Sequence, residues 1–253
     1  MPTISFFGPG IRPNRWMGLY DSIAQSGIDF DLTMVGPNEP KYTTPENLIY
    51  IKSNVKPVQC MEAAFRITKG ELIIPVADDE IFIDDSIAQV FHQYTEINDW
   101  KTIVSHRYVL NGVDISEGAE PAMRYYTWVP TSPLAPIAPL MSRRLWRELG
   151  GIDRRFCALY WDLDMWMRVY EYGGTGILHK TAKVEEVGTS VGGGEHTLYN
   201  KYGPVYDRRI LDSLWTLPPI GTGQILDKRM SPLQPFDDKD ILTVTQGVKG
   251  EWK

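Results

Sequence analysis

The sequence has few cysteines, no long apolar run and no surplus of positive charge. Its two cysteines, Cys60 and Cys157, lie far apart and show no metal-ligand spacing, so we expect buried free thiols rather than a disulfide. No apolar run approaches the roughly 18 residues of a membrane span, and the N-terminus lacks a basic region followed by an apolar stretch. These absences predict a cytoplasmic protein without a membrane span.

The net charge of −6 argues against nucleic acid as the main partner, because phosphate backbones recruit clustered lysine and arginine. An acidic protein that handles a phosphorylated ligand needs a cation to offset the repulsion. With 253 residues, 43% hydrophobic and 23% charged, the chain has the composition of a globular protein with one large domain or two small ones. The 8 tryptophans and 13 tyrosines leave two interpretations open, core packing or stacking on sugar rings and bases.

The first hundred residues alternate between strand patterns and helix patterns. Short β-favouring or apolar runs predict four strands, and apolar residues at helical spacing predict helices between and after them. The expected strands are residues 3–7, 30–35, 48–51 and 71–76, and the expected helices lie around residues 16–24, 57–69 and 87–94. This alternation predicts an α/β fold of three α/β/α layers around a mostly parallel sheet.

Ligands of parallel sheets bind beyond the carboxyl ends of the strands. Three predicted loops lie at that edge: a Gly/Pro loop at residues 8–13, an Asn/Glu loop at residues 36–39 and an acidic loop at residues 77–81. The sequence therefore predicts that these loops meet in one site.

The second half of the chain has a different character. Asn111-Gly112 predicts a two-residue hairpin turn, and residues 130–139 predict an ordered proline-rich loop. Ser142 is expected to cap a short helix, and a further helix is expected over residues 162–172. We divide the chain into a first half (1–110), a smaller second half (111–216) and an extended tail or lid (217–253).

The first acidic cluster is Asp78-Asp79-Glu80, directly after an apolar strand. Adjacent carboxylates repel each other unless they are solvated or neutralised by a cation. Mg²⁺ or Mn²⁺ prefers such oxygens and takes one or two of them together with substrate phosphates. The alternative is a solvated turn with helix-capping acids, so both a metal site and a structural turn stay open on the residues alone.

The second acidic cluster is Asp162 and Asp164, at the start of a predicted helix. The positive end of the helix stabilises a carboxylate there, and an acid in that place can accept a proton from an approaching hydroxyl. Because the two acids are two residues apart, they point in different directions, and Asp164 is spaced to pair with Arg168. Helix capping is the alternative for both.

Several segments, taken in order over roughly residues 3–200, resemble the inverting family-2 glycosyltransferases with the GT-A fold. The resemblance is to their opening strand and nucleotide loop, the helix before the metal strand, the Asp-x-Asp motif and the acceptor-side motif. In chain order the matching segments are residues 4–9 (ISFFGP), 62–71 (ending TKGE), 76–79 (VADD), 150–156 (GGIDRRF) and 161–164 (WDLD).

The resemblance implies transfer of a sugar from a UDP-, GDP- or dTDP-sugar to an acceptor hydroxyl, glycan or other, with inversion. It implies that Asp79 binds a divalent cation, Mn²⁺ or Mg²⁺, and that Asp162 is the general base. Some enzymes of this fold use a late histidine as an additional metal ligand: His196 is the first candidate here and His179 a competing one. The alternative for His196 is a solvated loop histidine. The donor site that the resemblance implies is formed by Pro9, Arg12, Asn38, Glu39 and Asp78. The resemblance further implies that residues 1–110 are the donor-binding half and residues 111–216 the acceptor-binding and catalytic half.

Three positions depart from the family pattern. Val76 stands where the first acid of the Asp-x-Asp motif is expected, Gly36-Pro37-Asn38 replaces an acid that touches the base, and Trp161 replaces a glutamate before the catalytic acid. These departures leave two alternatives. One is a non-catalytic glycan- or nucleotide-binding relative, and the other is a sugar nucleotidyltransferase, which is disfavoured because the first strand is not followed by a glycine-rich, basic triphosphate loop.

Overall fold

The computed structural model describes residues 3–116, 122–123, 136–187, 203–215, 229–239 and 241–242. The order of strands and helices in these residues is β1 (Ile4–Pro9), α1 (Pro13–Ala24), β2 (Phe30–Gly36), β3 (Leu48–Lys52), α2 (Pro57–Ile67), β4 (Leu72–Pro75), β5 (Glu80–Ile83), α3 (Ser86–Ile97), β6 (Thr102–Leu110), β7 (Val113–Asp114), β8 (Ala122–Met123), β9 (Ile137–Ser142), α4 (Arg143–Glu148), α5 (Trp161–Glu171), β10 (Thr175–Glu186), the π-helix η1 (Gly203–Asp207) and α7 (Arg208–Leu214).

The described strands form one curled, mixed sheet in the order β3-β2-β1-β4-β9-β6-β10-β5, with β7 beside β6 and β8 beside β10. Strands β3, β2, β1 and β4 are parallel, and so are β6 and β10. Strand β9 runs antiparallel between β4 and β6 and thereby joins the two parallel groups. The expected α/β class is confirmed, and β6 and β9 make the proposed donor and acceptor halves share one sheet.

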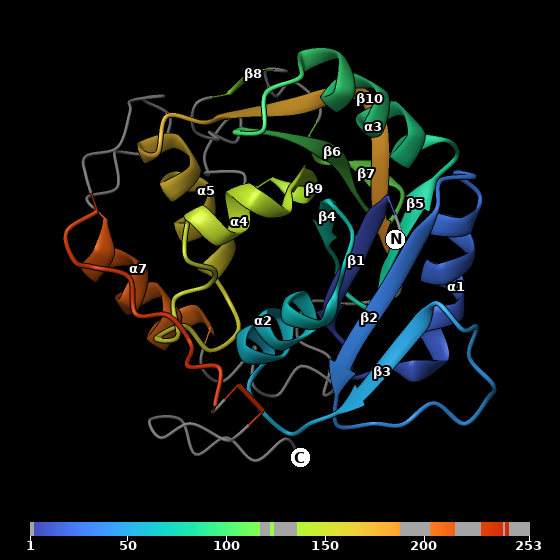
Figure 1. Ribbon diagram of the computed structural model, residues 1–253, viewed down its shortest axis with the longest axis horizontal. Helices are drawn as coiled ribbons and strands as arrows, with labels where there is room; N and C mark the ends of the chain where they lie inside the picture. Colours follow the sequence, from blue (N-terminus) through green and yellow to red (C-terminus); the bar gives the residue numbers. More distant parts are fainter. Residues whose placement is uncertain are drawn as a thin grey trace.

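Helices cover both faces of this sheet (Figure 1). Alternate strand residues face opposite sides: Phe6 packs in the core with α1 and α3, whereas Phe7 packs in the core with α2, α4 and α5. Phe7 also meets Trp146 of α4 edge to face, with 5.2 Å between ring centroids. The three α/β/α layers therefore enclose two hydrophobic cores, one on each face of a sheet that is buried on both sides.

Local sequence signals set several helix ends. Pro13 and Pro57 each begin a helix, where the missing backbone N–H has no partner to lose. The Ser142 hydroxyl accepts a hydrogen bond from the Leu145 backbone N–H at 3.0 Å, so the predicted cap of α4 is confirmed. The chain turns after α4 at Gly150 and Gly151, whose φ angles of +80° and +74° favour glycine.

Two predicted loops were partly wrong. Glu80 begins strand β5, which pairs with β10 more than a hundred residues further along the chain. Residues 137–139, expected in the proline-rich loop, belong to β9 and pair with β6. In both cases a distant strand supplies the hydrogen-bond partners, and such pairing overrides the local proline or acidic signal.

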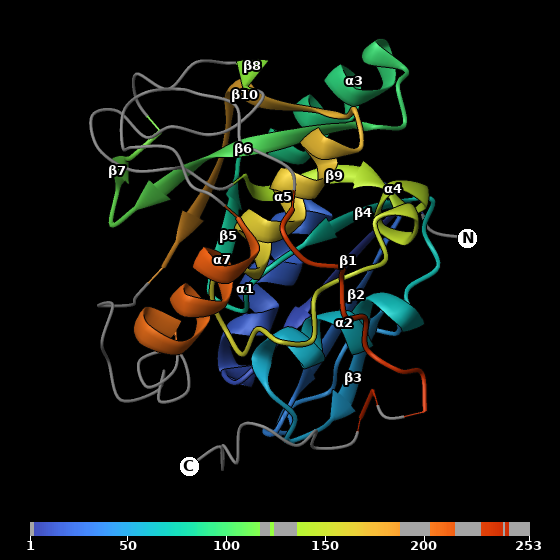
Figure 2. The same cartoon turned by 90° about the vertical axis from the view of Figure 1, so that its left-hand side faces the viewer.

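The described part of the tail lies along the body of the protein. Figure 2 shows residues 229–239 passing beside α4 and α2 without regular structure. Phe236 is buried in the core under α2, and its carbonyl accepts a hydrogen bond from Arg66 at 2.9 Å. Residues 229–239 therefore lie against the body of the protein as an extended segment.

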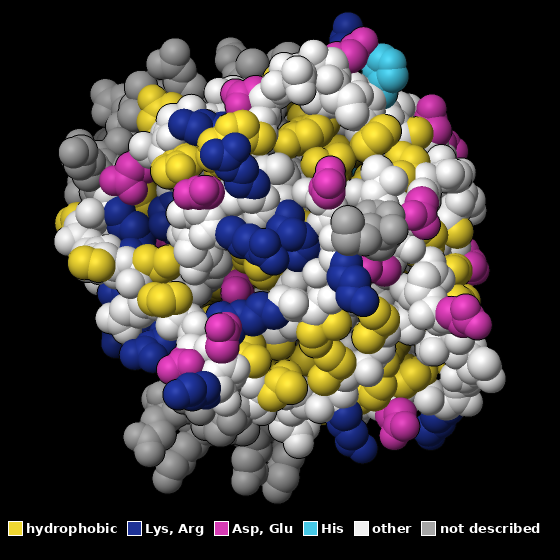
Figure 3. Space-filling model, in the orientation of Figure 1, with side chains coloured by type: hydrophobic (Ala, Val, Ile, Leu, Met, Phe, Trp, Pro, Cys, Tyr) yellow, Lys and Arg dark blue, Asp and Glu magenta, His cyan; other side chains and the backbone are white. Residues whose placement is uncertain are grey.

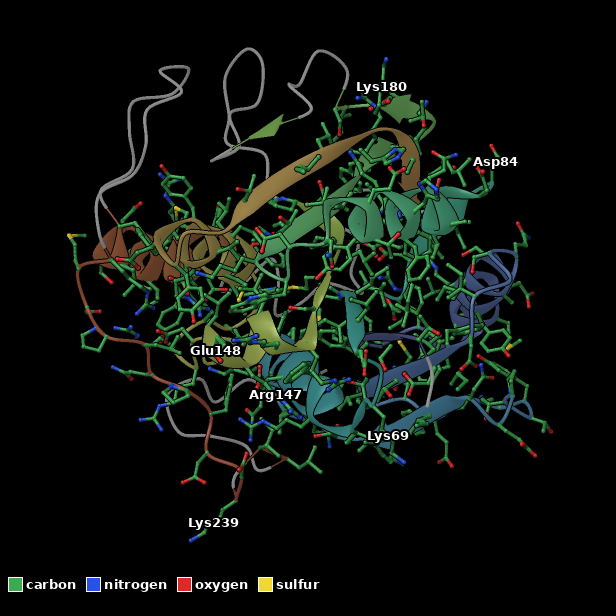
Figure 4. All side chains as sticks on the ribbon, turned by 45° about the horizontal axis from the view of Figure 1, so that its top comes forward. Lys69, Asp84, Arg147, Glu148, Lys180 and Lys239 are labelled. Atoms are coloured by element: carbon green, nitrogen blue, oxygen red, sulfur yellow. The ribbon has the colours of Figure 1, made fainter. Side chains whose placement is uncertain are left out.

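The surface charge is uneven. Lysine and arginine side chains gather in the middle of the face shown in Figure 3. Lys69, which precedes β4, and Arg147, in the last turn of α4, are exposed and point outward (Figure 4). They lie at the amino end of β4, away from the carboxyl edge of the parallel strands. None of the helices in the described residues has the length and apolar character to span a membrane.

Candidate functional site

The carboxyl ends of β1, β2 and β4 are packed so closely that glycine is required between them. A Cβ on Gly8 would lie 1.9 Å from the carbonyl oxygen of Val76, and a Cβ on Gly36 would lie 1.7 Å from that of Gly10. The loop after β1 is thus fixed between the ends of its two neighbours. The meeting of the three predicted loops at one edge rests on this packing.

Arg12 connects this loop to both aspartates of the acidic pair. Its guanidinium Nη2 lies 2.8 Å from Asp79 Oδ2 and also bonds Asp78 Oδ1, while its Nε donates to the same Asp78 oxygen at 2.9 Å. The other Asp78 oxygen accepts the backbone N–H groups of Ile11 at 2.7 Å and Arg12 at 2.6 Å. Both oxygens of Asp78 are therefore engaged by the loop.

The electrostatics of this trio follow from its burial. Arg12, Asp78 and Asp79 are 7%, 3% and 4% exposed. Burial opposes the charge of Arg12, but the hydrogen bonds and charges of the two aspartates outweigh it and raise its pKa. Burial raises the pKa of Asp79, and the charge of Arg12 opposes that shift. The guanidinium is a permanent cation here, and its charge opposes the rise in the pKa of Asp79.

The remaining residues assigned to the donor side have different environments. Pro9 ends β1 and is half-buried. Asn38 is exposed, and its side-chain amide donates to the Ile11 carbonyl at 2.7 Å, which ties the loop after β2 to the loop after β1. Glu39 is exposed and lies 3.9 Å from Lys52, an ion pair that contributes little in water. Pro9 and Asn38 thus lie at the edge with Arg12, while Glu39 is on the surface beside it.

The end of β10 returns to the acidic pair. The Val187 backbone N–H donates to the Asp79 carbonyl at 2.8 Å, and Arg15 donates to the Val187 carbonyl at 2.8 Å. Val187 is the last described residue before the segment that contains His196, which lies outside the described residues. Next to it, Glu186 is opposite Glu80 in the sheet and bonds the Tyr108 hydroxyl. Burial raises the pKa of Glu80 well above its ordinary value and so favours its neutral form.

The described acids do not fit a divalent cation as they stand. Asp78 is saturated by the loop, one oxygen of Asp79 bonds Arg12, and Val76 contributes a buried apolar side chain. Within the described ranges no three His, Cys, Asp or Glu side chains are grouped to hold a metal. The cation beside these carboxylates in this structure is Arg12.

The two acids at the start of α5 have separate environments. Asp164 is fully buried, and it bonds Arg168 Nε at 2.9 Å, as the spacing predicts, together with Trp215 Nε1 at 2.8 Å and Arg229 Nε at 2.9 Å. Asp162 is half-buried in the first turn, and its carboxylate accepts the Leu163 backbone N–H at 2.9 Å. Among the described residues no cation pairs with Asp162, and burial raises its pKa.

Asp207 is a further buried acid, and it holds the chain that leads into α5. Its carboxylate accepts the backbone N–H groups of Cys157, Ala158 and Leu159, each at 2.8 Å. Burial raises its pKa, and the three hydrogen bonds oppose that shift. This role was not predicted, because its only local signal in the sequence is a single acid directly before the short helix α7.

Asp153 and Arg229 were also missed. The Asp153 carboxylate is fully buried and bonds Arg155 at 2.7 Å and Arg229 at 2.5 Å. Arg229 reaches from the tail to both Asp153 and Asp164, so it connects the turn after α4 with α5. Nothing in the local pattern around Arg229 indicated partners that lie about 65 and 76 residues away along the chain.

Comparisons with known proteins found similar folds among solved structures. No protein-family model and no curated protein sequence matches the chain. Among solved structures it is similar to S. aureus TarS 1-349 (TM-score 0.54, 12% identity, 72% of this chain and 60% of that one) and to the same protein with UDP-GlcNAc (0.53, 13%, 74% and 60%). It is also similar to GalNAc-T7 with UDP, GalNAc and Mn²⁺ (0.55, 12%, 74% and 44%).

The fold is that of the GT-A glycosyltransferases. The chain spans less than two thirds of the length of the structures just named. At 12–13% identity the similarity establishes the architecture and leaves the activity to be argued from the site.

Proposed function

We propose that the protein is a glycosyltransferase that moves a sugar from a nucleotide-sugar donor to an acceptor hydroxyl. One observation carries the proposal: in a GT-A fold, the glycine-packed loop, the N-terminus of α1 and the Arg12–Asp78–Asp79 trio meet at the carboxyl edge of β1, β2 and β4. That edge is where open α/β sheets bind nucleotides, and a helix N-terminus with a fixed arginine favours phosphate.

On the donor side, Pro9, Asn38 and Asp78 shape the nucleotide pocket, and Arg12 and Asp79 provide its polar groups. Asp78 acts through the loop, because its carboxylate orders the backbone of Ile11 and Arg12. TarS has been crystallised with UDP and with UDP-GlcNAc, and GalNAc-T7 with UDP. These ligands support a UDP-sugar as the first donor to test, before GDP- and dTDP-sugars.

On the acceptor side, we assign Asp162 as the general base. Its carboxylate has no cationic partner among the described residues, and its pKa is raised by burial, which makes it a stronger proton acceptor while it stays ionised. The acceptor oxygen forms a bond to the anomeric carbon as its proton passes to Asp162. The bond from that carbon to the diphosphate oxygen breaks on the opposite face, and the nucleoside diphosphate leaves with the electron pair, so the configuration inverts.

The divalent cation expected from the sequence at Asp79 and His196 has no step in this mechanism, because Arg12 engages Asp78 and Asp79. We assign residues 1–110 to donor binding, 111–216 to the acceptor and catalysis, and 217–253 to a tail that supports α5. The observed contacts of Arg229 with Asp153 and Asp164 support that role for the tail.

The test is a reaction of the full chain with UDP-, GDP- and dTDP-sugars and a panel of hydroxyl acceptors. We expect release of one nucleoside diphosphate, and an anomeric configuration in the product, read by NMR, that is opposite to that of the donor. Retention of configuration would exclude Asp162 as a base in a single displacement. Nucleotide binding without transfer to any acceptor would favour the non-catalytic alternative, and pyrophosphate release from a nucleoside triphosphate and a sugar phosphate would favour a nucleotidyltransferase.

A further inference from the structure

The acidic pair of this site already has a cation, and that cation is part of the chain. One guanidinium bridges Asp78 and Asp79, with Nη2 2.8 Å from Asp79 and Nε 2.9 Å from Asp78. A planar guanidinium suits carboxylate geometry and keeps its charge at every physiological pH. A divalent ion bound to the same two acids would meet this positive charge at close range, so the two cations exclude each other.

The position of Arg12 is set by the backbone and does not depend on its side chain alone. The loop that carries it is fixed by close packing at Gly8 and Gly36, where a Cβ would lie within 2 Å of a carbonyl oxygen. Asn38 and Tyr42 bond the carbonyls on either side, those of Ile11 and Pro13. Arg12 is itself the residue before the first turn of α1, so its guanidinium is delivered to the acidic pair from the positive end of that helix.

The strand end offers no replacement for a metal ligand. Val76 is 2% exposed, and its backbone N–H donates to the Phe7 carbonyl at 2.9 Å, so both the side chain and the amide are used in packing the sheet. Asp78 and Asp79 bring two negative charges to this edge, and Arg12 and Arg15, the latter one turn into α1, bring two positive charges. Glu186 is a further acid close enough to raise the pKa of Asp79, so Arg12 and Arg15 offset part of the negative charge at this edge.

We infer that Arg12 replaces the divalent cation at this site, so that the nucleotide donor is bound without a metal. The inference rests on the proposed function, because it concerns the donor site of that same reaction. Arginine can supply the stabilisation of a departing diphosphate that a metal supplies elsewhere, since both present fixed positive charge to the leaving oxygen. Asp78 and Asp79 then serve to orient the guanidinium.

The experiment is calorimetric titration of the full chain with UDP, GDP and dTDP, once with EDTA and once with Mn²⁺. We expect one nucleotide to bind with dissociation constants that agree within about twofold in the two conditions. Binding that requires Mn²⁺ would overturn the inference and leave the proposed function intact. The absence of binding in both conditions would overturn the proposed function itself.

A variant gives a second, independent result. In Arg12→Ala we expect nucleotide binding in EDTA to weaken about tenfold or more, and Mn²⁺ to restore part of it, because the acidic pair is vacated. The matched control is Arg66→Ala, since Arg66 also bridges two acids, Glu62 and Asp238, but from α2. Equal binding by Arg12→Ala and the wild type in EDTA would overturn the inference. Circular dichroism shows whether Arg12→Ala is folded. If it is not, the titrations of the wild type in EDTA and in Mn²⁺ still test the inference.

Discussion

The buried ion network around α5 should contribute measurably to the stability of the protein. Arg229 bonds two carboxylates that are fully buried, those of Asp153 and Asp164, and its own side chain is 5% exposed. Arg229→Met keeps the aliphatic stem and removes the guanidinium. Each carboxylate then keeps one arginine, Arg155 or Arg168, and loses the other.

Removing one partner of a buried ion pair costs roughly 3–5 kcal/mol, because it leaves a charge without compensation. Since each acid retains a second arginine, we expect the lower end, about 3 kcal/mol. For a chain of this size about 1 kcal/mol lowers the melting temperature by roughly 2–4 °C, so Arg229→Met should melt roughly 6–12 °C below the wild type. The assay is thermal and urea unfolding, followed by circular dichroism.

An exposed ion pair with the same nitrogen–oxygen distance serves as the control. Arg208 Nε lies 2.9 Å from Asp212, as Arg229 Nε lies 2.9 Å from Asp164, but the Arg208 pair is about half exposed. Arg208→Met should therefore cost at most about 0.5 kcal/mol. Equal destabilisation by the two substitutions would show that burial of the ion network does not set its contribution to stability, contrary to this prediction.

Three further predictions follow from the site and the cores. Asp162→Asn should leave the nucleotide dissociation constant within about twofold and lower kcat by about 10²-fold or more. In the wild type, the pH profile of kcat/KM should fall on its acid side with a pKa above the ordinary aspartate value of 3.8, because the base must be ionised and burial raises its pKa. Gly36→Ala should destabilise by roughly 1–3 kcal/mol in urea unfolding, because its Cβ meets Gly10, whereas Gly18→Ala, inside α1 with its nearest neighbour at 3.3 Å, should be neutral or stabilising. Burial lowers the pKa of His106 from 6.5 to about 4, so the unfolded chain takes up the proton at a higher pH than the folded one. The free energy of unfolding should therefore fall by about 3 kcal/mol between pH 6.5 and pH 4, and His106→Asn should reduce this pH dependence.

The regular part of the fold was predictable because its signals are local. The strands at residues 3–7 and 30–35 and the helix that begins at Pro57 followed from apolar periodicity and from glycine and proline positions. The first helix was predicted around residues 16–24, but it begins earlier, at Pro13, which was expected in the loop. The hairpin at Asn111-Gly112 was confirmed by the antiparallel pairing of β6 with β7. Strand β5 was not predicted, because its pairing partner, β10, is far away in the sequence.

The sequence predicted which edge of the sheet carries the candidate site, but it predicted few of the side-chain contacts there. The sequence placed Arg12, Asn38 and the acidic pair at one end of the sheet, and Asp164 beside Arg168. It did not show that Arg12 pairs with both aspartates, because these residues are 66 and 67 positions apart and no helical or strand periodicity relates them. The same holds for Asp207, whose partners lie 48–50 residues away.

The most direct test of the central claim is product analysis with the wild type and Asp162→Asn in parallel. Each protein is incubated in turn with UDP-, GDP- and dTDP-sugars and the acceptor panel, and the nucleoside diphosphate and the glycosylated product are measured by mass spectrometry. We expect nucleoside diphosphate and product in equal amounts from the wild type, and nucleotide binding without product from the variant. Equal turnover by both proteins would contradict the assigned base, and no product from any nucleotide sugar with the folded wild type would contradict the assignment as a glycosyltransferase.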